Sequence, residues 1–153
     1  MDGRKIERGV IMGAWSHRIF DDDVTLDCLC ELAESDDIIE DMKGFMSEAL
    51  EAADDYLDYD AGAYGIVSAC VIDAKLNGLE MELLSESDDL EELTAILEKL
   101  DGQDVSELRR TAADVVKAVM AENSELRELW EENEECYPLV INIYNKLVQR
   151  LEN

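Results

Sequence analysis

The side chains whose types suit catalysis or metal binding lie close together near the start of the chain. His17 is the only histidine, it follows Ser16, and three aspartates come shortly after it at positions 21–23. A serine nucleophile needs a histidine base that a third group orients, and no pattern here completes that arrangement. The aspartates lack the Asp-x-Asp-x-Asp-Gly spacing of a calcium loop, which favours a role in capping the following helix. We expect no enzymatic activity, no bound metal and no cofactor.

A tight turn and two large aromatic side chains accompany this group. Gly13 can adopt backbone conformations closed to other residues, which suits an entry turn. Trp15 and Phe20 have no helical or strand pattern around them, so we expect both to insert into the core and hold the N-terminal segment in place. Asp22 or Asp23 is then a suitable N-cap, because a carboxylate accepts hydrogen bonds from the free amides of a first helical turn.

The segment from Val24 to Glu34 is the helix that follows. At 3.6 residues per turn, Asp27, Glu31 and Glu34 fall on one narrow stripe. Apolar residues and two cysteines cover most of the remaining circumference. A helix with so narrow a polar stripe is predicted to be mostly buried.

These residues resemble the opening signature of the bacterial domain of unknown function 4259 family, which is roughly Gly-Ala-Trp-Gly-x-Gly-x-Phe-x-Asn-Asp. The positions that carry the resemblance are Gly13, Ala14, Trp15, Phe20, Asp22, Asp23 and Asp27. Ser16 and Arg18 stand where the family usually has glycines, and Asp22 where it often has asparagine. The small-residue segment 63–74 and the segment 123–132 are also similar to the family, so the resemblance covers nearly the whole chain from Met12. It implies a fold, and the family name carries no established activity.

The charge of the chain is its most unusual property. The formal net charge is −26, from 39 acidic and 13 basic side chains. Between Ile19 and Glu98, 25 acidic residues stand against two lysines, which gives this part of the chain a net charge of −23. Such a field repels nucleic acid and anionic membranes, and it speeds association with basic partners. We therefore expect a basic protein partner, no nucleic acid and no membrane.

Two acidic stretches are the candidate contact surfaces. Tyrosines interleave with aspartates in the loop 54–60, and a run of glutamates follows at 131–135. The loop is open to two interpretations: a solvated connection whose tyrosines pack on the core, or an acidic and aromatic patch for a basic partner, since tyrosine is enriched at interfaces. The predicted partner-binding residues are Asp54, Asp55, Tyr56, Asp58, Tyr59, Glu131, Glu132, Glu134 and Glu135.

Apolar residues at helical spacing recur along the rest of the chain and predict an all-α fold. The almost wholly apolar segment 61–76 is the expected central helix, around which a single compact bundle of about six helices would pack. The other predicted helices lie near 24–34, 38–53, 88–100, 105–119 and 124–151, with the last region divided near Pro138. No strand hairpin or internal repeat is evident.

Capping residues set the predicted boundaries of these helices. Ser35 or Asp36 is expected to cap the second helix and Asp60 the central one, and Asn77-Gly78 to end the latter. Segment 104–107 resembles a capping box, and Asn123 or Ser124 is the expected cap of a helix carrying Trp130. Pro138 is tolerated in a first helical turn but not deeper, so it marks a helix start or a kink.

The chain is long enough for one domain with its own core. Residues 1–11 form a short basic extension without a pattern, which we expect to fray, and residues 12–153 a single all-α domain. Absence of a signal peptide and of an 18-residue apolar run predicts a cytoplasmic protein. The four cysteines have no metal or redox spacing and are each expected to be small core residues; they are Cys28, Cys30, Cys70 and Cys136.

Together these features favour a non-enzymatic acidic binding protein. Its expected role is that of an immunity protein or inhibitor that neutralises a basic, nuclease-like toxin, because a basic active cleft would attract a surface of this charge and be blocked by it. Two alternatives stay open. One is a nucleic-acid mimic that inhibits a DNA-binding or defence enzyme, and the other is a self-assembling structural module in which the charge confers solubility.

Overall fold

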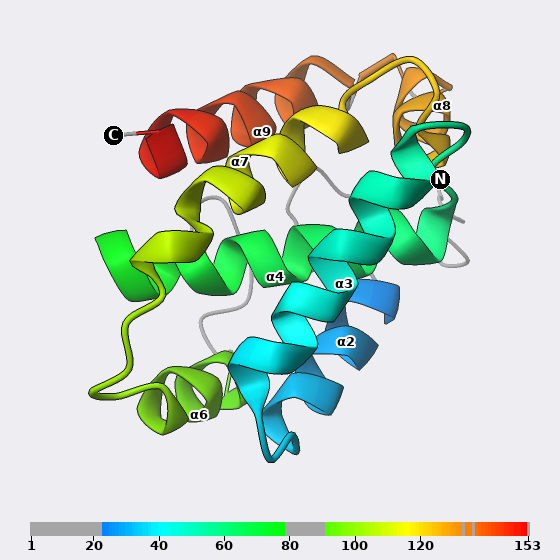
Figure 1. Ribbon diagram of the computed structural model, residues 1–153. Helices are drawn as coiled ribbons and strands as arrows, with labels where there is room; N and C mark the ends of the chain where they lie inside the picture. The colour runs from blue at the N-terminus through cyan, green and yellow to red at the C-terminus, as the bar shows by residue number, and fades with distance from the viewer. Residues whose placement is uncertain (1–22, 79–90, 133, 136, 153) are drawn as a thin grey trace, which may run out of the picture.

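The computed structural model describes residues 23–78, 91–132, 134–135 and 137–152. Within these ranges the chain forms seven α-helices and one short 3-10 helix (Figure 1). In chain order they are α2 (Asp23–Ala33), α3 (Ile38–Ala53), α4 (Tyr59–Asn77), α6 (Glu91–Lys99), the 3-10 helix η3 (Ser106–Leu108), α7 (Arg109–Val119), α8 (Glu125–Glu131) and α9 (Tyr137–Glu152). The all-α bundle predicted from the sequence is confirmed.

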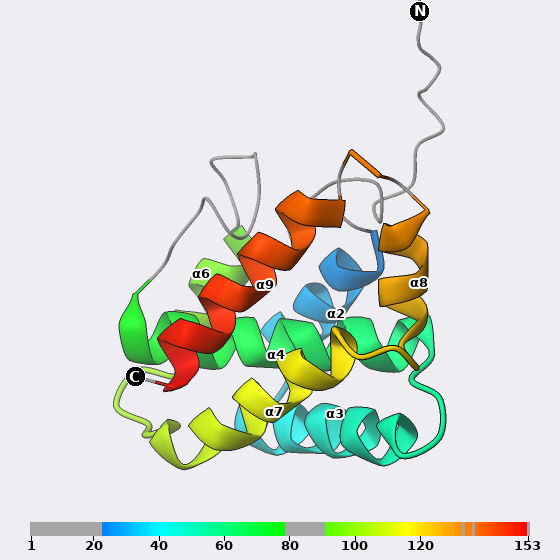
Figure 2. The same cartoon turned by 90° about the horizontal axis from the view of Figure 1, so that it is seen from above.

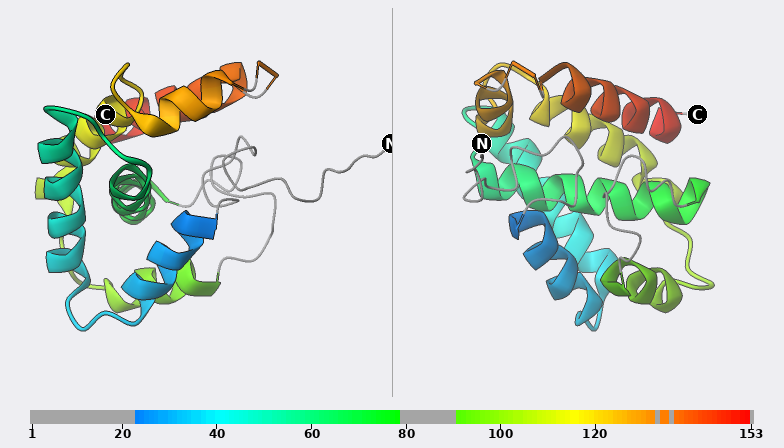
Figure 3. Two further views of the ribbon diagram at one scale, coloured as in Figure 1. Left: turned by 90° about the vertical axis from the view of Figure 1, so that its right-hand side faces the viewer. Right: turned by 180° about the vertical axis from the view of Figure 1, so that it is seen from behind.

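Helix α4 is the centre of the bundle. It contacts every other helix that the structure describes. Figure 2 shows α4 between α3 and α7 on one side and α2 and α6 on the other, and the left view of Figure 3 looks nearly along its axis. A helix surrounded in this way has to be apolar all round, and its residues from Gly62 to Ala74 are buried except Tyr64. The predicted central helix 61–76 is therefore confirmed.

A glycine lets α3 and α7 approach α4 closely. A Cβ atom on Gly65 would lie 2.8 Å from Val115 Cγ1 and 3.0 Å from Ala49 Cβ. Carbon atoms do not pack at these separations, so one of the three helices would have to move if Gly65 were larger. The sequence pattern of small residues in α4 thus fixes how tightly the bundle packs.

The N-cap of α3 lies one or two positions beyond the predicted one. Asp37, rather than Ser35 or Asp36, is the N-cap of α3, and its side chain accepts a hydrogen bond from the Glu40 amide. Ser35 supports it by accepting from the Asp37 amide (3.0 Å). Asp37 takes the cap because it stands immediately before the first helical residue with a non-helical backbone, from which its side chain reaches the free amides of the first turn.

The central helix begins earlier than predicted. Its N-cap is Asp58, whose side chain accepts a hydrogen bond from the Ala61 amide, and Asp60 lies within the first turn. At its other end, Gly78 has a φ of 91° and ends the helix as predicted. The predicted capping box at 104–107 is wrong, because Asp104 accepts from the Ser106 amide in a local turn and the chain then enters η3.

The C-terminal boundaries agree with the sequence. Ser124 is the N-cap of α8 and accepts from the Arg127 amide. Helix α9 begins at Tyr137, so Pro138 lies in its first turn, where a missing amide proton costs nothing. Trp130 is buried and its ring centroid lies 4.7 Å from that of Tyr144 in α9.

One carboxylate is buried among the described residues. Asp73 of α4 has 4% of its surface exposed, and Arg150 of α9 donates to it from Nε at 2.9 Å. Arg150 also donates to the Gly78 carbonyl (2.5 Å), and Asn77 Nδ2 donates to Asp73 Oδ1 (2.8 Å). This cluster joins the C-terminal ends of α4 and α9.

Two of the predicted core cysteines are buried and one is not. Cys28 and Cys70 lie in the core, and burial raises the pKa of both thiols. Cys30 is exposed, because the polar side of α2 is wider than the stripe of Asp27, Glu31 and Glu34 that the sequence indicated; all three of these acidic residues are exposed as well.

Several predictions lie outside the described residues. They concern the extension 1–11, the turn and anchors Gly13, Ala14, Trp15 and Phe20, the cap Asp22, and Cys136; His17 is outside as well. Helix α2 begins at Asp23. None of the described helices is long and apolar enough to cross a membrane.

Candidate partner-binding face

The loop between α3 and α4 is held firmly against the segment that leads into α8. The side chain of Leu57 is fully buried. Its amide donates to the Asn123 carbonyl and its carbonyl accepts from the Glu125 amide, both at 2.9 Å. These bonds form an isolated parallel bridge between Leu57 and Ser124. The loop is therefore anchored at its centre by backbone pairing with residues more than 60 positions away.

The side chain of Asn123 also holds the loop, in addition to its backbone carbonyl. Its side-chain amide donates to the Ala53 carbonyl at 2.7 Å and to the Asp55 carbonyl at 3.0 Å. These carbonyls lie where α3 ends, and the last carbonyls of a helix have no partner within the helix. Asn123 thus supplies hydrogen bonds to carbonyls at the end of α3 and, by the same contacts, fixes the start of the loop.

Two glutamates of α8 bind the tyrosines of the loop. The Tyr56 hydroxyl donates to Glu128 Oε1 at 2.6 Å, and the Tyr59 amide donates to Glu125 Oε1 at 2.8 Å. The bond to Glu128 raises the pKa of Tyr56 to about 12, because the carboxylate stabilises the protonated phenol. Neither glutamate is evident from the sequence, because no local pattern reveals a contact across 66 or 72 positions.

The structure brings the two predicted acidic stretches to the same end of the molecule. Asp54, Asp55, Tyr56 and Asp58 are exposed in the loop, whereas Tyr59 is half-buried against the core. The four predicted glutamates are exposed at the end of α8 and just after it; they are Glu131, Glu132, Glu134 and Glu135. One loop tyrosine therefore packs on the core and the other is exposed, and contact of the loop with a basic partner stays a prediction.

The glutamates at α8 lie on two different sides of the helix. Glu125 and Glu128 are three positions apart and both bind the loop, and Glu132, the C-cap of α8, follows Glu128 by four positions on the same side. Glu131 instead faces Arg127 at 3.7 Å. We call the exposed or half-buried carboxylates on the loop side the acidic face; they are Asp54, Asp55, Asp58, Glu125, Glu128 and Glu132.

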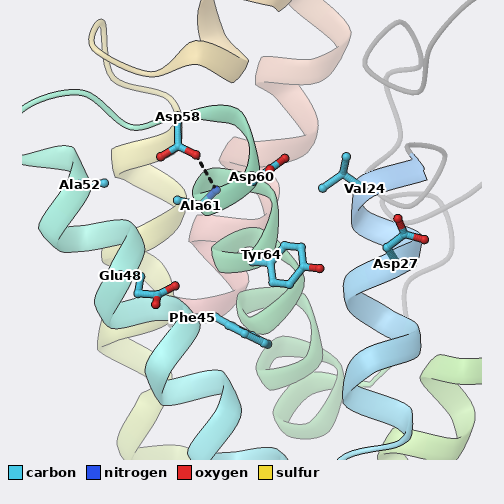
Figure 4. Close-up of a pocket in the computed structure, with 9 residues that line it drawn as sticks. All are labelled: Val24, Asp27, Phe45, Glu48, Ala52, Asp58, Asp60, Ala61 and Tyr64. Atoms are coloured by element: carbon cyan, nitrogen blue, oxygen red, sulfur yellow. Dashed lines mark hydrogen bonds between the residues drawn. The ribbon is translucent and has the colours of Figure 1, made fainter.

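A hollow of about 650 Å³ opens beside the acidic face, between α2, α3 and the start of α4 (Figure 4). Its apolar lining consists of Val24, Phe45, Ala52, Ala61 and Tyr64, and its acidic lining of Asp27, Glu48, Asp58 and Asp60. No basic residue is among the described side chains that line it. We call it the α2–α4 hollow, and it shares Asp58 with the acidic face.

Aromatic rings form part of the wall of the α2–α4 hollow. Phe45 and Tyr64 meet edge to face, with ring centroids 5.0 Å apart and an interplanar angle of 87°. The Tyr64 hydroxyl donates to Glu31 of α2, and this bond raises the pKa of the tyrosine. Tyr64 therefore links α4 to α2, and its orientation is set by Glu31 on one side and Phe45 on the other.

No cluster of three or more potential metal ligands occurs among the described residues. The carboxylate of Asp58 already accepts the Ala61 amide as a helix cap. In the part of the chain that the structure describes, the chemistry available at this end is a fixed set of negative charges next to aromatic and small apolar side chains. Such a surface suits recognition of a cation or a basic protein.

The fold and this face define a small acidic all-α domain with a preformed negative surface. The chain belongs to the family described as Domain of unknown function (DUF4259), whose sequence model matches residues 13–138. The resemblance noted in the sequence is thereby confirmed. No curated protein and no solved structure matches the chain.

Proposed function

We propose that the protein is a non-enzymatic binder of a basic protein, acting in the cytoplasm as an immunity protein or inhibitor that neutralises a nuclease-like toxin. The observation that supports it best is the fixation of the acidic loop by the Leu57–Ser124 bridge and by Asn123. Association costs less free energy when the contact surface is ordered before binding.

The electrostatics support the same proposal. A protein with a net charge of −26 attracts basic proteins over distances comparable to the Debye length. The acidic face is the surface on which we propose that such a partner docks. The active cleft of an enzyme that cleaves nucleic acid is basic because it holds phosphates. An acidic surface seated in such a cleft would exclude the substrate.

The proposal is tested by recovering partners from the native host. The tagged full-length protein is used as bait at low and at moderate salt, and bound proteins are identified. One basic nuclease-like protein, bound one to one, supports the inhibitor. Failure to recover any basic protein above the level of a charge-scrambled control contradicts it.

Two variants show whether the acidic face carries the binding. The first removes three of the six negative charges of the face with Asp54→Asn, Asp55→Asn and Glu132→Gln. The second removes the same charge far from it, at the exposed Glu98, Asp101 and Glu107. Loss of the partner from the first bait and its retention by the second is the expected result.

A nucleic-acid mimic is the second candidate, supported by the same charge. It predicts recovery of many DNA-binding proteins in place of one partner, because carboxylates that imitate phosphates are recognised by every protein that reads the backbone. Recovery of the protein itself, persisting at high salt, would instead favour a self-assembling module, since charge-led contacts weaken with screening.

A further inference from the structure

We propose that the α2–α4 hollow is a receptor for an arginine-bearing segment of the basic partner, an inference that rests on the proposed function. The hollow combines an apolar and aromatic wall with four carboxylates drawn from α2, α3 and α4. Figure 4 shows Asp27 and Glu48 on opposite sides of Tyr64, with Asp60 at the start of α4. A cation that enters therefore meets negative charge from several directions.

Arginine fits this combination better than lysine does. A guanidinium is planar and weakly hydrated, so it can lie on an aromatic ring while its edge donates to carboxylates. Phe45 and Tyr64 provide the rings, and Asp27, Glu48 and Asp60 provide acceptors within the same hollow. A lysine ammonium would satisfy the charge and leave most of the aromatic wall uncovered.

The size of the hollow calls for more than one side chain. Its volume of about 650 Å³ lies within the range of about 300–1,000 Å³ that ligand pockets occupy. The five apolar residues of its lining would contact an aromatic or aliphatic neighbour of the arginine. The occupant that fits is a short segment in which basic and apolar residues alternate.

The hollow is preorganised by contacts that hold its walls. Tyr64 donates to Glu31 across to α2 and meets the edge of Phe45 on α3. Asp58 is fixed as the cap of α4. Side chains already held in place lose little freedom when a ligand binds, which favours affinity.

The hollow also continues the acidic face. Asp58 belongs to both, and the preceding residue, Leu57, is bridged to Ser124 at the start of α8. A partner seated on the loop and α8 could thus reach the hollow with one projecting segment. Charge complementarity and this continuity are the reasons for assigning the site to the partner.

The first test uses synthetic peptides with the full-length protein and isothermal titration calorimetry. One capped peptide alternates arginine with tryptophan, and another of equal length and charge alternates lysine with alanine. We expect the arginine peptide to bind one to one and about tenfold more tightly than the lysine peptide, through its aromatic and guanidinium contacts. Equal affinities would overturn the proposal.

Matched variants locate the site. Asp27→Asn, Glu48→Gln and Asp60→Asn together remove three of the four negative charges of the hollow and leave the Asp58 cap intact, and Ala52→Phe fills the hollow without changing charge. Each is expected to weaken the arginine peptide about tenfold or more. The control that removes the same charge at Glu98, Asp101 and Glu107 should weaken it less than about threefold, by the long-range field. Equal loss in both triple variants would show that only net charge acts.

Two further outcomes separate the possible explanations. If Trp15→Ala with Arg18→Gln tightens binding of the arginine peptide, the chain's own residues compete for the hollow and the assignment to a partner is wrong. In the host pull-down, a hollow variant that recovers the basic partner undiminished would overturn the inference while the proposed function stands. Absence of any basic partner with wild-type bait contradicts the proposed function itself.

Discussion

The carboxylates at the two ends of helix α4 differ in their burial and in their partners. At the C-terminal end, the buried carboxylate of Asp73 accepts hydrogen bonds from Arg150 and Asn77. At the N-terminal end, Asp58 and Asp60 are exposed, and none of the described side chains that line the hollow they share with Asp27 and Glu48 is basic. Figure 2 shows these ends on opposite sides of the molecule, one beside the end of α9 and the other beside α8.

The difference separates charge that the fold requires from charge that it tolerates. A buried ion needs a partner because its desolvation is costly, so Arg150 is part of the packing of α4 against α9. Exposed carboxylates keep their hydration and need no partner, and several of them near one another repel. Stability therefore explains the C-terminal cluster, whereas it does not account for the concentration of carboxylates at the N-terminal end.

The largest effect should follow from breaking the C-terminal cluster. Arg150→Met keeps the apolar part of the side chain but leaves Asp73 buried without its cation. We expect the free energy of unfolding to fall by about 3 kcal/mol, as for other buried pairs that lose one partner. Urea denaturation measures it. Lys146→Met, at an exposed cation one turn earlier in α9, is the control and should change stability little; an equal loss in both would show that the cluster contributes nothing specific.

A smaller effect is expected where the acidic loop is anchored. Asn123→Ala removes the side-chain donors to the Ala53 and Asp55 carbonyls, and we expect a loss of about 1–2 kcal/mol. Hydrogen exchange of the Leu57 amide should accelerate more than that of amides in the middle of α4. The exposed Asn145→Ala in α9 should be neutral or slightly stabilising, since alanine is the better helix former. Unchanged exchange at Leu57 would mean that the backbone bridge holds the loop without Asn123.

Much of the fold was predictable because its signals are local. The apolar segment 61–76, the stop at Gly78 and the position of Pro138 each depend on residues within a turn or two. The caps of α3 and α4 were misplaced by one or two positions, because several aspartates stand in a row and any of them could cap. Which one does is decided by where the preceding chain is held, as at Leu57.

The candidate site was predictable only as two separate acidic stretches. Composition located Asp54–Tyr59 and the glutamates after Trp130. The two stretches lie close together because Asn123, Glu125 and Glu128 form hydrogen bonds with residues more than 60 positions away. The α2–α4 hollow was not predictable, because its walls come from three helices and a single sequence does not reveal which helices adjoin.

Neutralising carboxylates at the N-terminal end should have an effect of the opposite sign. Asp27→Asn with Glu48→Gln is expected to raise Tm on the order of 1 °C at low salt by relieving repulsion. The gain should vanish at high salt, where exposed charges are screened. Glu152→Gln, which removes the partner of Lys117 at 2.5 Å, should instead lower Tm slightly. If both substitutions lower Tm, the carboxylates of the hollow do not repel one another in the folded protein.

The smallest effect concerns the hydrogen bond that Tyr56 donates to Glu128. The folded-state pKa of Tyr56 is raised from 10.0 to about 12, so the bond's contribution to stability is complete below pH 10 and is lost as the pH rises through about 12. Absorbance titration at the phenolate band, taken as wild type minus Tyr56→Phe, isolates this tyrosine. Glu128→Gln should move its midpoint down toward 10. A midpoint already near 10 in the wild-type protein would show that the loop and α8 are not joined there, and that the acidic face is less fixed than the C-terminal end of α4.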